Sequence, residues 1–334
     1  MAPSATTPAP GATSLSTDPI LLSLRKTLTT ESEPLAKRFR ALFSLKHLAC
    51  QSDSPSCIPA ISAIAAGFSS PSALLKHELA YCLGQTKNLA AVPYLRAVLE
   101  DRGEDAMCRH ESAEALAAIG DVESLALLIE RRDDNEEVKV VRETCEISVA
   151  RIEWENSEER KLEKLRQSDF ASIDPAPPME ATATIESLEK SLLDTTQPLF
   201  IRYRAMFGLR DLASPPSLPT AVQAVLALAK GFTDPSALFR HEIAFVFGQL
   251  SHPASIPALS AALADLEESS MVRHEAAEAL GSLGDEDGVE ETLKKFLNDK
   301  EQVVRESVEV ALDMAEFEKS GETEYALIPE VAAA

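Results

Sequence analysis

Apolar residues recur along much of this chain at the spacing of an amphipathic helix. Leu75, Leu79 and Leu83 lie four residues apart, which places them on one face of a helix. Pro71 precedes this apolar stripe and a glycine follows it, and these residue types commonly mark where a helix starts and ends. Glycines stand at four such expected helix ends: Gly84, Gly120, Gly248 and Gly284. The periodicity therefore predicts helices of moderate length separated by turns.

The helical pattern is repeated. SPSALLKHELAYCLGQT (70–86) is similar to DPSALFRHEIAFVFGQL (234–250), and MCRHESAEALAAIGD (107–121) is similar to MVRHEAAEALGSLGD (271–285). The offset is 164 residues in both cases, so the chain is a duplication. Each half divides further into about four units of a short helix, a turn and a longer helix. Helix pairs repeated at such a spacing predict an all-α fold, a HEAT-repeat α-solenoid of two pseudo-symmetric halves with about four helical hairpins each.

The two halves are expected at residues 19–152 and 183–318. Between them, residues 153–182 begin as a charged run and continue as a Pro-rich segment that cannot be helical throughout, so they predict a linker. Residues 1–18 are rich in Ala, Pro, Ser and Thr and lack the basic and apolar parts of a secretion signal, which favours a disordered N-terminal tail. Residues 319–334 are expected to form a C-terminal tail.

Composition limits the possible partners. The formal net charge is −22, which disfavours nucleic acid because phosphates repel such a surface, and which attracts a basic protein or a polyamine-like substrate. The alternative is that the negative charge only keeps the protein soluble. No apolar stretch approaches the length that spans a membrane, so no membrane partner is expected. Five cysteines form no CxxC pair and are expected to be small buried thiols in a reducing, cytoplasmic setting.

Four of the six histidines are followed directly by glutamate, at matched positions of the repeat: His77-Glu78, His110-Glu111, His241-Glu242 and His274-Glu275. The same position holds other residues in the outer units: Phe39-Arg40, Glu143-Thr144, Tyr203-Arg204 and Glu306-Ser307. A requirement of the repeat fold would appear in all eight units. Something local to the inner units therefore requires histidine and glutamate there.

Equivalent positions on stacked helices lie about 10 Å apart, so halves that face each other would bring all four pairs together. Imidazole with carboxylate suits Fe, Mn or Zn, and two histidines with one carboxylate leave open positions on non-haem Fe(II). Two such sets predict a dinuclear centre. The alternative is that the pairs lie on a solvated, salt-bridged face.

The remaining residues of interest are less specific. His47 and His252 lack a following glutamate and are expected to be structural or exposed. Met107 and Met271 precede their histidines by three residues, so they lie one turn away on the same side of the helix. They either line a substrate pocket or fill the core.

A HEAT-repeat chain of two four-unit halves, with two His-Glu motifs in each, resembles the deoxyhypusine hydroxylase family over roughly residues 20–318. The motifs that carry the resemblance are KHELAYCLGQ, RHESAEALAAIGD, RHEIAFVFGQL and RHEAAEALGSLGD. The resemblance implies a di-iron monooxygenase that uses dioxygen to hydroxylate a deoxyhypusine side chain on translation initiation factor five-A. It places two Fe²⁺ ions among the side chains His77, Glu78, His110, Glu111, His241, Glu242, His274 and Glu275.

Two ligand schemes stay open. In the first, the ligands cross between halves: Glu242 joins the N-terminal histidines and Glu78 the C-terminal ones, leaving Glu111 and Glu275 to hold the substrate's amines during catalysis. In the second, every ligand stays within its own half. Two other functions also stay open, a dinuclear Zn or Mn hydrolase and a non-catalytic protein-binding scaffold. The chain is expected to be a monomer in which the metal joins the halves, with few other contacts between them.

Overall fold

The computed structural model describes residues 18–163, 170, 172–179 and 182–320. These residues form α-helices and short 3₁₀-helices without a strand, which confirms the predicted all-α class. Within this part of the chain no helix has both the length and the hydrophobicity that crossing a bilayer requires. The expected tails fall largely outside it: residues 1–17 and 321–334 are not described, and the last helix continues to Ser320.

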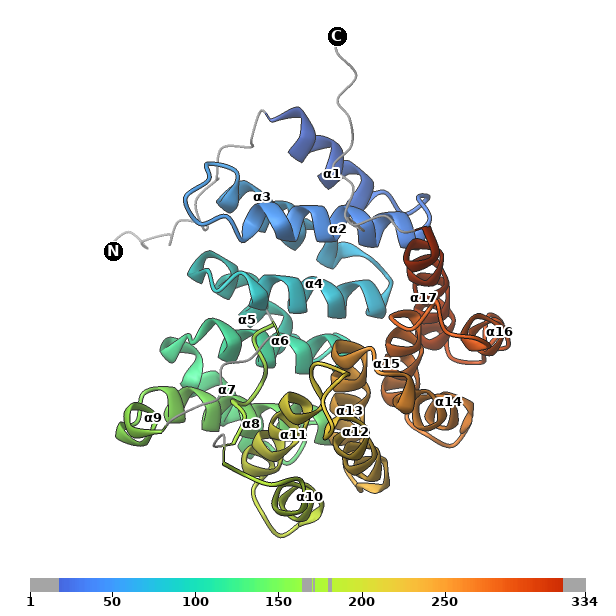
Figure 1. Ribbon diagram of the computed structural model, residues 1–334. Helices are drawn as coiled ribbons and strands as arrows, with labels where there is room; N and C mark the ends of the chain where they lie inside the picture. The colour runs from blue at the N-terminus through green and yellow to red at the C-terminus, as the bar shows by residue number, and fades with distance from the viewer. Residues whose placement is uncertain (1–17, 164–169, 171, 180–181, 321–334) are drawn as a thin grey trace, which may run out of the picture.

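Eight hairpins of a shorter and a longer helix make up the two halves (Figure 1). The N-terminal half consists of α1 (Pro19–Thr29), α2 (Leu35–Ala49), α3 (Cys57–Ala65), α4 (Ala73–Gln85), α5 (Val92–Glu100), α6 (Ala106–Ile119), α7 (Leu125–Asp133) and α8 (Lys139–Glu155). The C-terminal half consists of α10 (Ile185–Leu193), α11 (Leu199–Ala213), α12 (Ala221–Ala229), α13 (Ala237–Leu250), α14 (Ile256–Ala264), α15 (Ser270–Gly281), α16 (Val289–Lys294) and α17 (Gln302–Ser320). Short 3₁₀-helices connect several of them: η1 (Ala66–Ser69), η2 (Leu89–Ala91), η3 (Val122–Ser124), η4 (Lys230–Thr233) and η5 (Pro253–Ser255).

Local sequence explains where the helices that carry the His-Glu pairs begin. The Ser72 hydroxyl accepts a hydrogen bond from the backbone N–H of Leu75 at 3.0 Å and so caps α4. Ser236 caps α13 in the same way, through the N–H of Phe239 at 3.2 Å. The equivalent caps give both helices the same start, so that each His-Glu pair lies at the same distance from the start of its helix.

Two of the four glycines, Gly120 and Gly284, follow the ends of helices, and the other two lie inside helices. Gly120 ends α6 with φ of +79°, a left-handed conformation that glycine adopts easily. Gly84 and Gly248, in contrast, lie inside the last turns of α4 and α13, so the helices extend past the expected ends. A Cβ at Gly84 would lie 2.8 Å from the Cα of Ala115, so glycine is needed there because α4 and α6 pack closely.

Each half has its own hydrophobic core between the short and long helices. Leu75, Leu79 and Leu83 are fully buried in the N-terminal core, which confirms the predicted stripe. Phe239 and Ile243 take the places of Leu75 and Leu79 in the C-terminal core. The long helices of the two halves therefore present their remaining faces to each other.

The halves contact each other at both ends of the molecule, where α17 lies next to α2 and α11 next to α8 (Figure 1). The Ser72 hydroxyl donates to the Glu306 carboxylate at 2.7 Å, and the Ser236 hydroxyl donates to Glu143 at 2.8 Å. Both glutamates occupy the repeat position that holds His-Glu in the inner units. The Arg40 guanidinium pairs with Asp313, with Nε 3.0 Å from Oδ2. The expectation that few contacts other than the metal join the halves is therefore wrong.

The linker also joins the halves. Its charged run is partly helical, since α8 reaches Glu155 and α9 spans Glu158–Leu162. Residues 172–179, here named the strap, are not helical, as the prolines predict, and residues 174–178 are buried. The backbone N–H of Ile173 donates to the Gln85 side chain at 2.9 Å, and Asp174 accepts from the Arg210 guanidinium at 2.7 Å. The strap thus forms hydrogen bonds with residues of both halves.

Candidate metal centre

The four histidines of the His-Glu pairs meet in the middle of the molecule. They come from the inner long helices of the two halves, α4, α6, α13 and α15. The ring centroids of His77 and His110 are 5.3 Å apart, those of His241 and His274 are 5.4 Å apart, and across the halves His77 lies 5.9 Å from His241. All four are at most 6% exposed. The predicted convergence of the imidazoles between facing halves is therefore present.

These imidazoles lack the partners that buried polar groups normally have. Both ring nitrogens of His77, His110 and His241, and Nε2 of His274, have no hydrogen-bond partner among the described residues. A buried polar atom without a partner costs on the order of 1–3 kcal/mol, so native proteins rarely leave several together. Seven such nitrogens in one cluster fit a site that binds a ligand through imidazole, as metals do.

One carboxylate in each half lies close to an imidazole, and the two contacts are equivalent. Glu111 Oε2 lies 3.3 Å from Nε2 of His77, and Glu275 Oε2 lies 3.3 Å from Nε2 of His241. Each glutamate follows the histidine of one helix but reaches the histidine of the preceding long helix in the stack. The repeat of this contact reflects the duplication of the sequence.

Potential ligand atoms group into three sets within the described part of the chain, each with all atoms within 4.8 Å of one another. The sets are His77 with His110 and His241, His241 with His274 and Glu275, and His110 with Glu111 and Glu114. The first set crosses the halves, whereas the other two stay within one half. Neither Glu78 nor Glu242 belongs to these sets, so the geometry favours Glu111 and Glu275 over them as ligands.

Burial shifts the charges of the cluster toward neutrality. It raises the pKa of Glu78 to about 7 and that of Glu275 to about 8, and repulsion from the carboxylate of Glu278 adds to both shifts. Burial also lowers the pKa of His241 to about 3. The pKa shifts are upward for Glu111, Glu114, Glu242 and Glu278 and downward for His110 and His274, and burial is the largest cause in each case. Neutral imidazoles are the form that binds metal, and a bound cation would favour the ionised carboxylates.

Glu114 and Glu278 belong to the site although the sequence analysis did not single them out. Each lies four residues after its histidine, one helical turn along the same face. Glu278 Oε1 lies 3.6 Å from His274 Nδ1 and accepts a hydrogen bond from the Ser307 hydroxyl at 3.0 Å. The signal was present in the sequence as H-E-x-x-E, which occurs in both copies of the motif.

A cavity of about 260 Å³ opens onto the cluster. His77, His241 and six carboxylates line its interior, with side chains from both halves. Tyr81 and Phe245, at equivalent positions of the two halves, pack edge to face with centroids 6.0 Å apart. Besides Glu114 and Glu278, the partly exposed residues of the lining are Phe43, Lys46, Tyr81, Phe245, Gly248, Gln249, Ser282 and Met314, which form the mouth. The cavity is therefore acidic inside and largely apolar at its mouth.

Met107 and Met271 do not line this cavity, which favours the second of their two interpretations, that they fill the core. Both are buried, at 6% and 7% exposure, within the hydrophobic cores of their halves. Met314, on the last helix, is the methionine that lines the mouth.

His47 and His252 lie outside the cluster, as predicted. His47 is exposed and its Nε2 lies 3.0 Å from the amide nitrogen of Gln51. His252 is buried, and its Nδ1 accepts the N–H of Ala254 at 3.1 Å, which caps η5. One is therefore a surface residue and the other is structural.

Comparisons with known proteins agree with the repeat architecture. A family model of HEAT repeats matches residues 58–150 and 222–313. A deoxyhypusine hydroxylase of Neosartorya fischeri is 67% identical over 100% of this chain and 99% of its own, and one of Neurospora crassa is 71% identical over 93% of this chain and 98% of its own. The structure of human deoxyhypusine hydroxylase in complex with glycerol matches with a TM-score of 0.79 and 45% identity, covering 89% of this chain and 96% of that one.

Proposed function

Because this chain belongs to the deoxyhypusine hydroxylase family, we propose that it is a di-iron monooxygenase that uses dioxygen to hydroxylate the deoxyhypusine side chain of translation initiation factor five-A. One observation carries the proposal within this molecule. Four buried imidazoles without hydrogen-bond partners meet carboxylates at the base of an acidic cavity. This donor set suits non-haem iron and leaves room for a second molecule.

The residues divide into holders of metal and holders of substrate. The four histidines would bind the two Fe²⁺ ions together with Glu111 and Glu275, which lie closest to the imidazole nitrogens. When bound, the irons would supply the activation of dioxygen that attack on an unactivated C–H bond requires. Glu78 and Glu242 then stay available for the substrate. This assignment exchanges the roles that the first ligand scheme gave to the two pairs of glutamates.

The cavity is complementary to deoxyhypusine. This side chain is a lysine extended by an aminobutyl group, so it carries a secondary amine and a terminal primary amine, both cationic at neutral pH. The interior carboxylates attract these amines, and the aromatic pair Tyr81 and Phe245 offers apolar surface to the methylenes between them. Burial of the carboxylates excludes water, which strengthens their attraction for the cationic substrate.

The test is hydroxylation of the protein substrate. The chain, loaded with Fe²⁺, is incubated with dioxygen, a reductant and the deoxyhypusine form of the factor, and mass spectrometry follows the gain of one oxygen atom on that residue. We expect hydroxylation by the native chain and by the control His47→Ala, and a loss of at least about a hundredfold in Glu78→Gln. Absence of hydroxylation by the iron-loaded native chain would refute the proposal.

A further inference from the structure

We propose that Lys46 sets the specificity of the site for a protein-bound deoxyhypusine side chain over free polyamines, by holding its ammonium at the open approach to the cavity. The inference rests on the proposed function, since it concerns the substrate of that same site. It starts from a difference between the two halves that the duplication alone would not produce.

The cavity is open on one side of the pseudo-twofold arrangement and closed on the other. Lys46 and Phe43 line its mouth and are partly exposed. Their counterparts 164 residues later, Arg210 and Phe207, are fully buried and do not line the cavity. Two approaches that the repeated sequence would make equivalent are therefore different in the folded chain.

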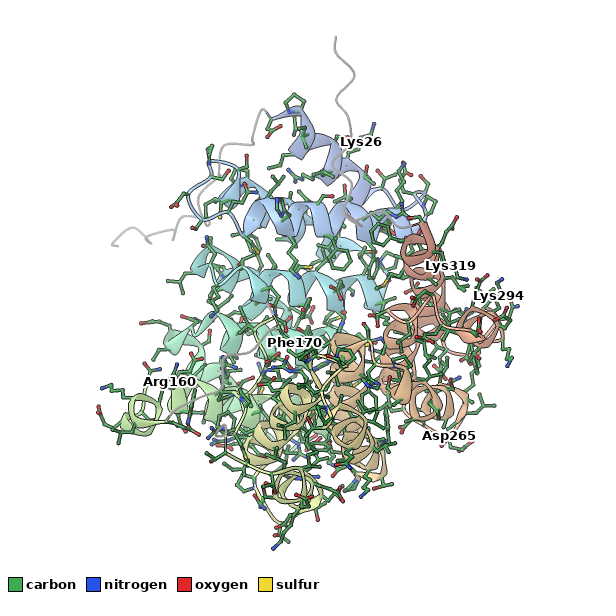
Figure 2. The ribbon with its side chains drawn as sticks, in the orientation of Figure 1. Lys26, Arg160, Phe170, Asp265, Lys294 and Lys319 are labelled. Carbon is green, nitrogen blue, oxygen red and sulfur yellow. The ribbon has the colours of Figure 1, made fainter. Side chains whose placement is uncertain are left out.

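The strap closes the approach beside Arg210. Asp174 accepts from the Arg210 guanidinium at 2.7 Å, and Gln249 donates to the Ser172 hydroxyl at 2.7 Å. The ring of Phe170 lies 4.3 Å from the guanidinium carbon of Arg210. Figure 2 shows Phe170 where the two stacks of helices meet. The approach that remains open within the described structure is the one beside Lys46.

Lys46 places positive charge at the mouth of an otherwise acidic cavity. Its Nζ lies 4.8 Å from the centroid of the Tyr81 ring and 5.9 Å from that of Phe43. It forms no ion pair with any other described residue. The remaining charged residues of the lining are six glutamates, of which four are at most 9% exposed, whereas Glu114 and Glu278 are partly exposed. The sign of the charge therefore changes from negative inside to positive at the entrance.

This arrangement distinguishes deoxyhypusine from spermidine. Both contain an aminobutyl group joined to a secondary amine. Beyond that amine, spermidine ends in an ammonium after a propyl group, whereas deoxyhypusine continues as methylenes into an uncharged peptide backbone. With the aminobutyl end inside, the outer ammonium of spermidine would arrive beside Lys46.

Lys46 acts on that outer ammonium in two ways. Like charges close together in a partly buried mouth repel, and a penalty against the competing ligand is a common source of specificity. The Lys46 ammonium also occupies the face of Tyr81, which could otherwise bind a cation. The deoxyhypusine side chain meets neither obstacle, because an apolar methylene takes the corresponding place.

The experiment compares spermidine with the acetylspermidine whose acetyl group neutralises the aminopropyl nitrogen. Calorimetry under nitrogen measures the Kd of each probe for the full, iron-loaded chain. We expect the ratio of the spermidine Kd to the acetylspermidine Kd to fall about tenfold in Lys46→Gln relative to the native chain. Lys46→Arg, which keeps the charge, should keep the native ratio.

Lys37→Gln is the matched control, because Lys37 lies on the same helix but is exposed and paired with Glu33, and it loses the same charge. Its ratio should equal the native one. An unchanged ratio in Lys46→Gln would overturn the inference, as would failure of both probes to bind the native chain. Hydroxylation of the protein substrate, measured on the same samples, separates failure of the inference from failure of the proposed function. If hydroxylation is present while the Kd ratio is the same in Lys46→Gln and the native chain, only the inference fails.

Discussion

At the scale of single residues, the unusual feature is how many titratable side chains are buried together at one site. The sequence sufficed to place the four histidines together, because His-Glu occupies the repeat position in the inner units and different residues occupy it in the outer ones. It could not assign the glutamates, because neighbours on a helix differ by about 100° and side-chain reach decides which one meets the next histidine. Glu111 reaches His77 on another helix, which no local pattern specifies.

Burial of Glu78 and Glu275 predicts how the stability of the metal-free chain depends on pH. Their pKa values of about 7 and about 8 lie above the ordinary value of 4.5, so folding favours their protonated forms. The stability that this contributes is complete below about pH 4.5 and is lost as pH rises through 7 to 8. We expect urea unfolding of the metal-free chain to show lower stability at pH 8.5 than at pH 6.5, by up to about 1.4 kcal/mol per pH unit for each group.

Iron provides the control for this dependence, because the bound metal favours the ionised carboxylates and should remove the loss of stability at high pH. Without metal, the double variant Glu78→Gln with Glu275→Gln should lose the part of the dependence that these two carboxylates contribute, whereas the other buried glutamates of the site keep their part. A metal-free native chain that is equally stable at both pH values would contradict the pKa shifts.

At the scale of the elements, the helix starts and the apolar faces of the helices could be predicted from the sequence, whereas the distance at which two helices pack could not. Ser72 and Ser236 are recognisable caps, and the leucines of α4 are a recognisable stripe. Gly84 also looked like a helix end, but its reason is a contact with Ala115, a residue of the next hairpin. Such contacts depend on how closely two helices pack, which the sequence of neither helix shows alone.

The pair Gly84 and Gly248 tests this account of packing. A Cβ at Gly84 would lie 2.8 Å from the Cα of Ala115, whereas one at Gly248 would lie 3.4 Å from the Cα of Ala279, an ordinary contact. We expect Gly84→Ala to lower the free energy of unfolding by about 1–3 kcal/mol, and its counterpart Gly248→Ala to change it by less than about 1 kcal/mol. Chemical denaturation measures both, and equal effects would show that the two helix pairs pack alike.

At the scale of the whole molecule, the two halves form a closed arrangement around the site. The duplication predicted that the halves face each other, but not what holds them. The hydrogen bond between Ser72 and Glu306 joins residues 234 positions apart, and no local sequence pattern predicts it. The strap likewise read only as a Pro-rich linker, because its burial depends on Arg210 and Gln85, which lie in different halves.

Contacts at both ends predict that the halves stay together without metal. We expect small-angle scattering to give the same radius of gyration, on the order of 20 Å, for the iron-loaded and the metal-free chain. Arg40→Ala combined with Glu143→Gln, which breaks one contact at each end, should enlarge the metal-free chain. A native chain that expands on loss of metal would show that these contacts are too weak to hold it closed.

The central claim is that the four histidines between the halves bind a pair of iron ions, and metal analysis tests it most directly. After reconstitution with Fe²⁺ under nitrogen and removal of excess metal, the native chain should hold about two irons, with an absorbance that changes on exposure to oxygen. His110→Ala and His274→Ala should each lose iron, and His47→Ala should retain it. Full iron content in His110→Ala or His274→Ala, or tightly bound zinc with no response to oxygen in the native chain, would contradict the account.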